Sequence, residues 1–145
     1  MKQILRVITM MLTPLFVFAS PDHGAKPDAH LVFAASGYHA HLSWEQGPQE
    51  GVESILRIVF MNPNTHMPAA IPFDVAVKLF MPSMGHGSSP TKTEKVFDTN
   101  GAELPGVYRV RKIQFLMAGD WDLRVTIKNE TESETQVYAL TVDGS

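Results

Sequence analysis

The chain has 145 residues, with 12 Lys and Arg against 15 Asp and Glu, and it contains no Cys. A formal net charge of −3 without a basic stripe argues against nucleic-acid binding, because phosphates require clustered Lys and Arg. The lack of Cys excludes zinc fingers, thiol redox chemistry and thiolate copper sites.

Residues 1–19 have the pattern of a secretory signal peptide. Lys2 and Arg6 precede an uncharged apolar run over residues 7–19, and small residues lie near the −3 and −1 positions of a cut after Ala19. The run has roughly 13 residues, whereas a membrane-spanning helix needs about 20. We therefore expect a periplasmic or secreted protein with no membrane insertion after cleavage. An uncleaved anchor is the alternative.

The rest of the chain is predicted to form one domain after a short leader. Residues 20–28 are rich in turn-forming residues and have no apolar period, which predicts a flexible leader. Residues 29–145 are close to the usual size of a single domain. Without disulfides, burial of apolar side chains must hold that domain together.

From residue 29 onward, apolar and polar side chains mostly alternate with the period of two that half-buried strands show. The cleanest case is residues 121–128, in which every second side chain is apolar. Further strands are predicted, in chain order, at residues 38–44, 55–61, 73–81, 95–97, 107–113 and 136–142. One weak helical candidate, residues 49–56, is explained equally well by a strand that begins near Glu53.

Turn-forming sequences separate these runs. They lie at residues 62–64, 100–101, 105–106 and 119–120. The strands recur about every 10–15 residues, a spacing typical of sandwiches. We therefore predict an all-β fold, an antiparallel immunoglobulin-like β-sandwich of seven or eight strands.

Residues 80–87, with the sequence Phe-Met-Pro-Ser-Met-Gly-His-Gly, carry the most informative side chains. Pro82 should end the preceding strand, which places Met84 and His86 on a loop. Two thioethers and an imidazole are ligands for a soft metal, above all Cu(I), and they do not attract Ca²⁺ or Mg²⁺. The alternative is that Met81 is a core residue and His86 a solvated loop histidine.

Met117 lies just before the strand at 121–128, and so at a sheet end. If that end also carries residues 81–87, Met117 becomes a further candidate ligand. The alternative is core packing against Trp121. The same Trp121 could cover a bound cation by a cation–π contact, although sandwich cores commonly hold a Trp.

Other histidines form weaker candidates. His39 and His41 share one face of a predicted strand with side chains about 7 Å apart, a spacing that suits Cu(II) or Zn²⁺. They equally fit the plain polar face of a strand. His66-Met67 is a second His/Met pair in a Pro-rich loop, and His23 and His30 could join a weak Cu(II) site near the mature N-terminus.

The sequence gives no support for an enzyme. It has no Cys nucleophile, no Gly-x-Ser-x-Gly elbow and no convincing acid partner for its loop serines. Phosphate-binding and dinucleotide-binding glycine patterns are missing as well.

Three segments together resemble a known family. They are Leu-Phe-Met-Pro-Ser-Met-Gly-His-Gly at residues 79–87, Pro-Gly-Val-Tyr at 105–108 and Phe-Leu-Met-Ala-Gly-Asp-Trp-Asp-Leu at 115–123. In this order they resemble the YtkA-like domain, which is related to the FixH group of small exported or membrane-tethered β-sandwich domains. The resemblance covers about residues 50–128.

The resemblance implies an immunoglobulin-like fold and a role in copper handling in the cell envelope, including delivery to respiratory oxidases. The matching positions are Met81, Met84, His86 and Met117. The chain departs from the FixH type in having no convincing transmembrane anchor, which favours a free periplasmic protein.

We therefore expect a periplasmic copper-binding protein, a Cu(I) carrier, buffer or chaperone. Its partners would be a copper acceptor or a respiratory oxidase assembly protein. The alternative is a metal-free protein-interaction module of the cell envelope, whose interface would be an exposed apolar patch around Phe80, Met81 and Met84.

Overall fold

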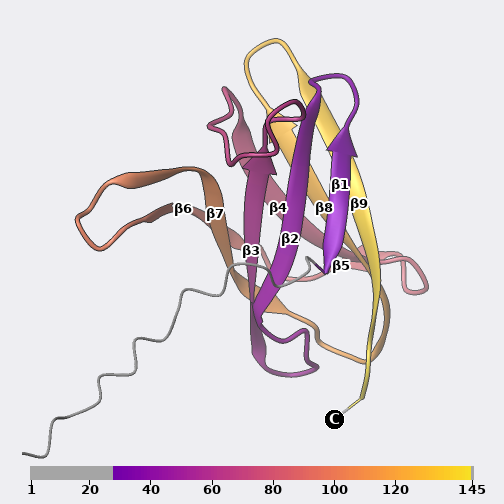
Figure 1. The fold of residues 1–145 in the computed structure, drawn as a ribbon. Helices are drawn as coiled ribbons and strands as arrows, with labels where there is room; N and C mark the ends of the chain where they lie inside the picture. The colour runs from indigo at the N-terminus through magenta and orange to yellow at the C-terminus, as the bar shows by residue number, and fades with distance from the viewer. Residues whose placement is uncertain (1–27, 145) are drawn as a thin grey trace, which may run out of the picture.

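The computed structural model describes residues 28–144, so the predicted signal peptide and nearly all of the predicted leader lie outside the described residues. This part of the chain forms strands β1 (Ala29–Phe33), β2 (Tyr38–Gln46), β3 (Glu53–Met61), β4 (Asp74–Met81), β5 (His86–Gly87), β6 (Lys92–Phe97), β7 (Glu103–Gln114), β8 (Gly119–Lys128) and β9 (Ser133–Val142). Figure 1 shows them in two layers. The described residues contain no helix of the length and apolarity needed to cross a membrane.

The strands make two antiparallel sheets, in the orders β1-β2-β3-β7-β6 and β5-β4-β8-β9. The orders β2-β3-β7-β6 and β4-β8-β9 correspond to the ABED and CFG sheets of immunoglobulin domains. The predicted all-β, immunoglobulin-like sandwich is therefore confirmed.

The described residues hold nine strands, where the sequence predicts seven or eight. The additional strands are β1, which pairs with β2, and β5, which has two residues and pairs with the end of β4. Both are too short to show a recognisable alternation. The helical alternative at residues 49–56 is wrong, because β3 begins at Glu53 and buries every second side chain from Ser54 onward.

The core lies between the two sheets and consists of the apolar face of each. In β8 the side chains of Trp121, Leu123, Val125 and Ile127 are at most 1% exposed. Aromatic rings from both sheets pack among them, including Phe115 at 5.6 Å from Trp121 between ring centroids. Full burial of one large apolar side chain contributes roughly 1.5–3 kcal/mol, so these residues stabilise the domain without disulfides.

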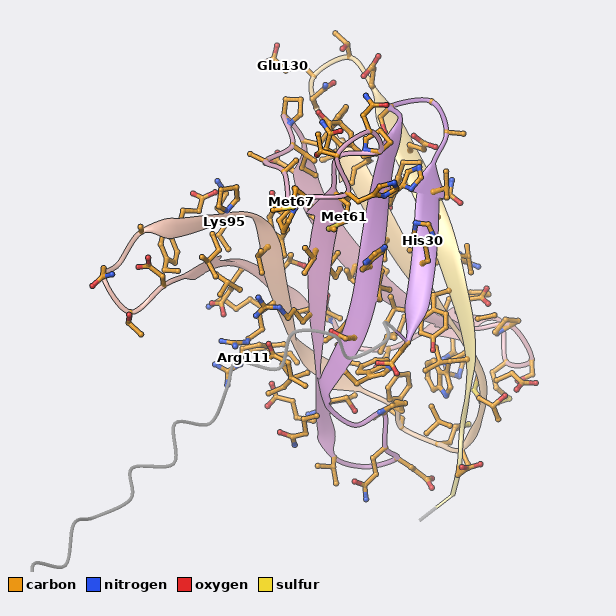
Figure 2. The ribbon with its side chains drawn as sticks, in the orientation of Figure 1. His30, Met61, Met67, Lys95, Arg111 and Glu130 are labelled. Atoms are coloured by element: carbon orange, nitrogen blue, oxygen red, sulfur yellow. The ribbon has the colours of Figure 1, made fainter. Side chains whose placement is uncertain are left out.

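Strands β6 and β7 extend beyond the sandwich as a hairpin arm, on which Figure 2 labels Lys95. At the base of this arm, Gly106 packs against the loop that follows β3. Its φ angle is +72°, and a Cβ atom there would lie 2.1 Å from the carbonyl oxygen of Ala69. Only glycine lets the two backbones approach this closely.

We predict that Gly106→Ala lowers the free energy of unfolding by roughly 3 kcal/mol or more, since backbone must move to remove the clash. Gly101→Ala is the matched control, because Gly101 has a φ of +82° but nothing within 4 Å of its Cβ position. The control should cost roughly 1–2 kcal/mol from backbone strain alone. Urea denaturation followed by circular dichroism measures both. Equal costs would contradict the close packing described here.

Candidate functional site

A tight turn joins β4 to β5 and carries the predicted Met/His ligands. Strand β4 ends at Met81, as Pro82 predicts, and the carbonyl oxygen of Met81 accepts hydrogen bonds from the N–H groups of Met84 and Gly85 at 3.2 and 3.0 Å. Gly85 has a φ of +68°, which turns the chain back toward β4. The turn therefore returns His86 to the position opposite Met81.

Met81 and His86 are direct cross-strand partners, so their side chains leave the same side of the sheet with Cβ atoms about 5 Å apart. Met81 is buried, at 4% exposed, whereas Met84 between them is 56% exposed and His86 is exposed. The Nδ1 atom of His86 lies 3.1 Å from the carbonyl oxygen of Gly87. A carbonyl only accepts, so this contact is a hydrogen bond when Nδ1 carries the proton, and in that neutral tautomer the Nε2 lone pair is available to a metal.

Met117 lies at the same end of the sandwich as this turn. The Met81 Cε atom is 3.0 Å from the point where a Cβ on Gly119 would stand, which brings the loop at residues 115–119 against β4. The Met117 side chain is 36% exposed, and its carbonyl oxygen accepts a hydrogen bond from the indole Nε1–H of Trp121 at 3.0 Å. The condition that made Met117 a candidate ligand is therefore met.

Trp121 is a core residue. Its side chain is 1% exposed, and its ring packs edge-on against Phe115. The sequence left open whether Trp121 packs in the core or covers a cation, and the structure places it in the core. Its role at this end is to hold the backbone of Met117 through the indole hydrogen bond.

The apolar patch proposed around Phe80, Met81 and Met84 is not exposed as a unit. Met81 is buried, and the guanidinium carbon of Arg124 lies 4.0 Å from the centroid of the half-buried Phe80 ring. The exposed apolar side chains at this end instead include Met84, Leu116 and Met117. The predicted position of the apolar patch was wrong, because the alternation of apolar and polar residues in the sequence does not reveal which neighbouring side chain covers another.

The weaker histidine candidates on β2 belong to a separate cluster. His39 and His41 project outward, on the face opposite to the buried Ala40 and Leu42, and His30 of β1 lies opposite His41 in the β1–β2 register. The His30 Nε2 atom is 3.2 Å from His39 Nδ1. The ring centroid of His30 is 5.0 Å from that of His39 and 4.9 Å from that of His41.

Burial lowers the pKa of His41, and the charges of His30, His39 and His66 lower it further. His41 therefore favours the neutral form near neutral pH, which is the form that binds metals. The sequence placed His30 with His23 and not with this cluster, because β1 is too short to be recognised. His23 lies outside the described residues.

The pair His66-Met67 lies in the loop after β3, at the end of the sandwich away from the β4–β5 turn. Met61 faces His39 across the β2–β3 ladder and forms a bridge to Pro68, and Met67 is 63% exposed. Figure 2 shows Met61, Met67 and His30 in the half of the molecule away from β5 of Figure 1. The predicted ligands are thus divided between two ends.

Among the described residues, neither the acidic and imidazole side chains nor the groove along β4 adds a ready-made ligand site to this arrangement. Within residues 28–144, no group of three or more His, Cys, Asp or Glu side chains is placed so that it could hold a metal ion as it stands. A groove of about 510 Å³ runs along the edge of β4 and is lined by apolar and hydroxyl side chains together with Lys78 and Arg124. It contains none of the His and Met candidates.

Comparison with known proteins gives one match. A family model described as YtkA-like matches residues 34–126, which include all of the predicted Met and His ligands except His23 and His30. Among curated proteins and among solved structures, no match reaches significance.

We predict that Trp121→Phe lowers the free energy of unfolding by roughly 1–3 kcal/mol, because it leaves a cavity and removes the donor to the Met117 carbonyl. Trp44→Phe, at a partly buried position, is the control and should cost less than about 1 kcal/mol. Urea midpoints measured by circular dichroism compare the two. If both variants lose the same stability, Trp121 does not anchor this end of the sandwich.

Proposed function

The chain belongs to the YtkA-like family, and from this premise we propose that it is an exported copper-binding protein that carries or buffers Cu(I). The proposed ligands are Met81, Met84, His86 and Met117, at the end of the sandwich formed by the β4–β5 turn and the 115–119 loop. The proposal concerns transfer of an ion, and no bond of a substrate is made or broken.

The observation that carries the proposal is the β4–β5 register. It sets Met81 directly opposite His86, with Met84 in the turn between them. The contact between Met81 and Gly119 adds the Met117 loop to the same end. Four neutral donors from segments more than 30 residues apart in the sequence thus share one end of the fold.

The donor set fits a soft monovalent ion. Thioether sulfur and neutral imidazole favour Cu(I), whereas Ca²⁺ and Mg²⁺ require oxygen ligands. The exposure of Met84, His86 and Met117 leaves the ion open to attack by the ligands of an acceptor. Such a site suits a carrier, since stepwise ligand exchange hands the ion on without unfolding the domain.

The setting of the proposal is the periplasm or the exterior, after cleavage of the signal peptide predicted at residues 1–19. The proposed partners are a copper acceptor or a protein that assembles a respiratory oxidase. Both follow from the copper chemistry and from the family resemblance of residues 79–87, 105–108 and 115–123.

A second candidate function is a metal-free interaction module. It is favoured by the exposed apolar side chains of Met84, Leu116 and Met117 at the same end of the sandwich. Methionine adapts its shape to a partner surface, and clustered exposed apolar residues often mark such surfaces.

We predict that the wild-type protein binds one equivalent of Cu(I) in competition with a chelator under anaerobic reducing conditions, and that Met84→Ala with His86→Ala abolishes this binding. Both side chains are exposed, so the double variant should unfold within about 0.5 kcal/mol of wild type. His66→Ala with Met67→Ala is the matched control, because it removes the same residue types from the other end. It should bind Cu(I) as wild type does.

A wild-type protein that fails to compete for Cu(I) would sink the copper proposal. Association with a protein partner that the Met84 and His86 substitutions abolish in the absence of metal would then identify the interaction module.

We further predict that Met81→Leu weakens Cu(I) binding at least about tenfold, since it removes a thioether ligand. Leucine keeps the volume of the buried side chain, so the free energy of unfolding should change by less than about 1.5 kcal/mol. The same competition titration and a urea melt measure both quantities. Unchanged Cu(I) affinity would make Met81 a core residue only.

A further inference from the structure

We propose that His30, His39 and His41 form a second metal site, on the outer face of the β1–β2 pair, for a divalent transition metal such as Zn²⁺ or Cu²⁺. This site goes beyond the proposed Cu(I) site in position, in ligand type and in the ion that it takes. It rests on the geometry of three imidazoles contributed by two adjacent strands.

The first support is the distance between the His30 Nε2 and His39 Nδ1 atoms, which is 3.2 Å. Two nitrogens that bind one tetrahedral zinc ion at about 2.0–2.1 Å lie roughly 3.3 Å apart. The two nitrogens already face each other, because one accepts the proton of the other. A metal ion inserted between them needs only a neutral tautomer change in the donor ring, with no net loss of a proton.

The second support is the position of His41. Its ring centroid is 4.9 Å from that of His30, and the His30–His39 centroids are 5.0 Å apart. Imidazoles that share a tetrahedral ion have centroids roughly 5 Å apart. As the rings stand, they do not form a complete three-ligand site. The proposal therefore requires the His41 ring to turn so that one of its nitrogens points toward the other two.

The third support is the strand framework. His39 and His41 leave the same face of β2, and the register places His30 of β1 opposite His41. Ala40, between them, and Leu42, directly after His41, are fully buried. The backbone positions of the three ligands are therefore fixed by the core, so metal binding costs side-chain order only.

The donor chemistry selects the ion. Imidazole nitrogen suits Zn²⁺ and Cu²⁺, and at a given site Cu²⁺ binds more tightly than Zn²⁺. The charges that act on His41 are those of His30, His39 and His66, with no carboxylate among them. A site without carboxylates offers little to Ca²⁺ or Mg²⁺.

Zinc titration by calorimetry on the full chain tests the proposal, because Zn²⁺ is redox-inert and thioethers bind it poorly. We predict that wild type binds one equivalent of Zn²⁺. His30→Gln or His39→Gln should weaken this binding at least about tenfold, because removing a direct ligand costs more affinity than removing a group that only supports a ligand. Met61→Leu and His86→Gln are the controls and should bind Zn²⁺ as wild type does. Circular dichroism checks that every variant is folded.

Cu²⁺ electron paramagnetic resonance gives an independent readout. The wild-type spectrum should show hyperfine coupling to two or three imidazole nitrogens, reduced in the His41→Gln variant. The proposal is overturned if wild type binds no Zn²⁺, or if folded His30→Gln and His39→Gln variants bind it unchanged.

The two metal proposals fail separately. Met84→Ala with His86→Ala should lose Cu(I) and keep Zn²⁺, whereas His30→Gln with His39→Gln should lose Zn²⁺ and keep Cu(I). Loss of both metals in either variant would mean that the ends of the sandwich do not act as separate sites, and it would overturn this inference.

Discussion

The burial of one face of each sheet against the other is the constraint on which this structure depends. With no disulfide to tie the chain, the alternating apolar side chains of β8 and of β3 must close the core. Each strand ends where that alternation or its hydrogen bonding is interrupted, as at Pro82 after β4. The core therefore sets where the loops with the candidate ligands begin and end, and contacts within those loops matter less.

This constraint also separates the candidate ligands. On β2, His39 pairs with Met61 near one end, and Gln46 pairs with Ile55 near the other, where the following turn donates to the Phe115 carbonyl oxygen at 2.9 Å. Seven residues of strand span roughly 23 Å. His41, the member of the cluster nearer that end, is five residues from Gln46, roughly 17 Å along the strand. A single ion cannot bridge even this distance, so the two proposed sites would be separate.

The two ends differ in chemistry as well as in position. The β4–β5 turn combines thioethers with one imidazole, a set that selects a soft ion such as Cu(I). The face of β1 and β2 offers three imidazoles, a set found in zinc sites. Both sets lack oxygen ligands, so both disfavour hard cations such as Ca²⁺ and Mg²⁺. They differ in that thioethers favour a soft ion and imidazoles a borderline one.

The amino-acid sequence determined the strand content, the sandwich and the end of β4 at Pro82, because alternation and turn chemistry are local properties of the chain. It also identified Met84 as a turn residue next to a sheet end, whereas the prediction of a loop position for His86 was wrong, because His86 pairs with Met81 in the two-residue strand β5. The signal peptide and the copper chemistry stay predictions.

Only the tertiary structure decided which ends meet. It brought Met117 to the end that carries Met81, put Trp121 in the core, and added His30 to His39 and His41 through β1. These are pairings between distant segments, and strand register depends on how two faces fit together in the core. Local alternation holds no information about that fit, so neither the short β1 nor the contact between His30 and His39 could be found from the sequence.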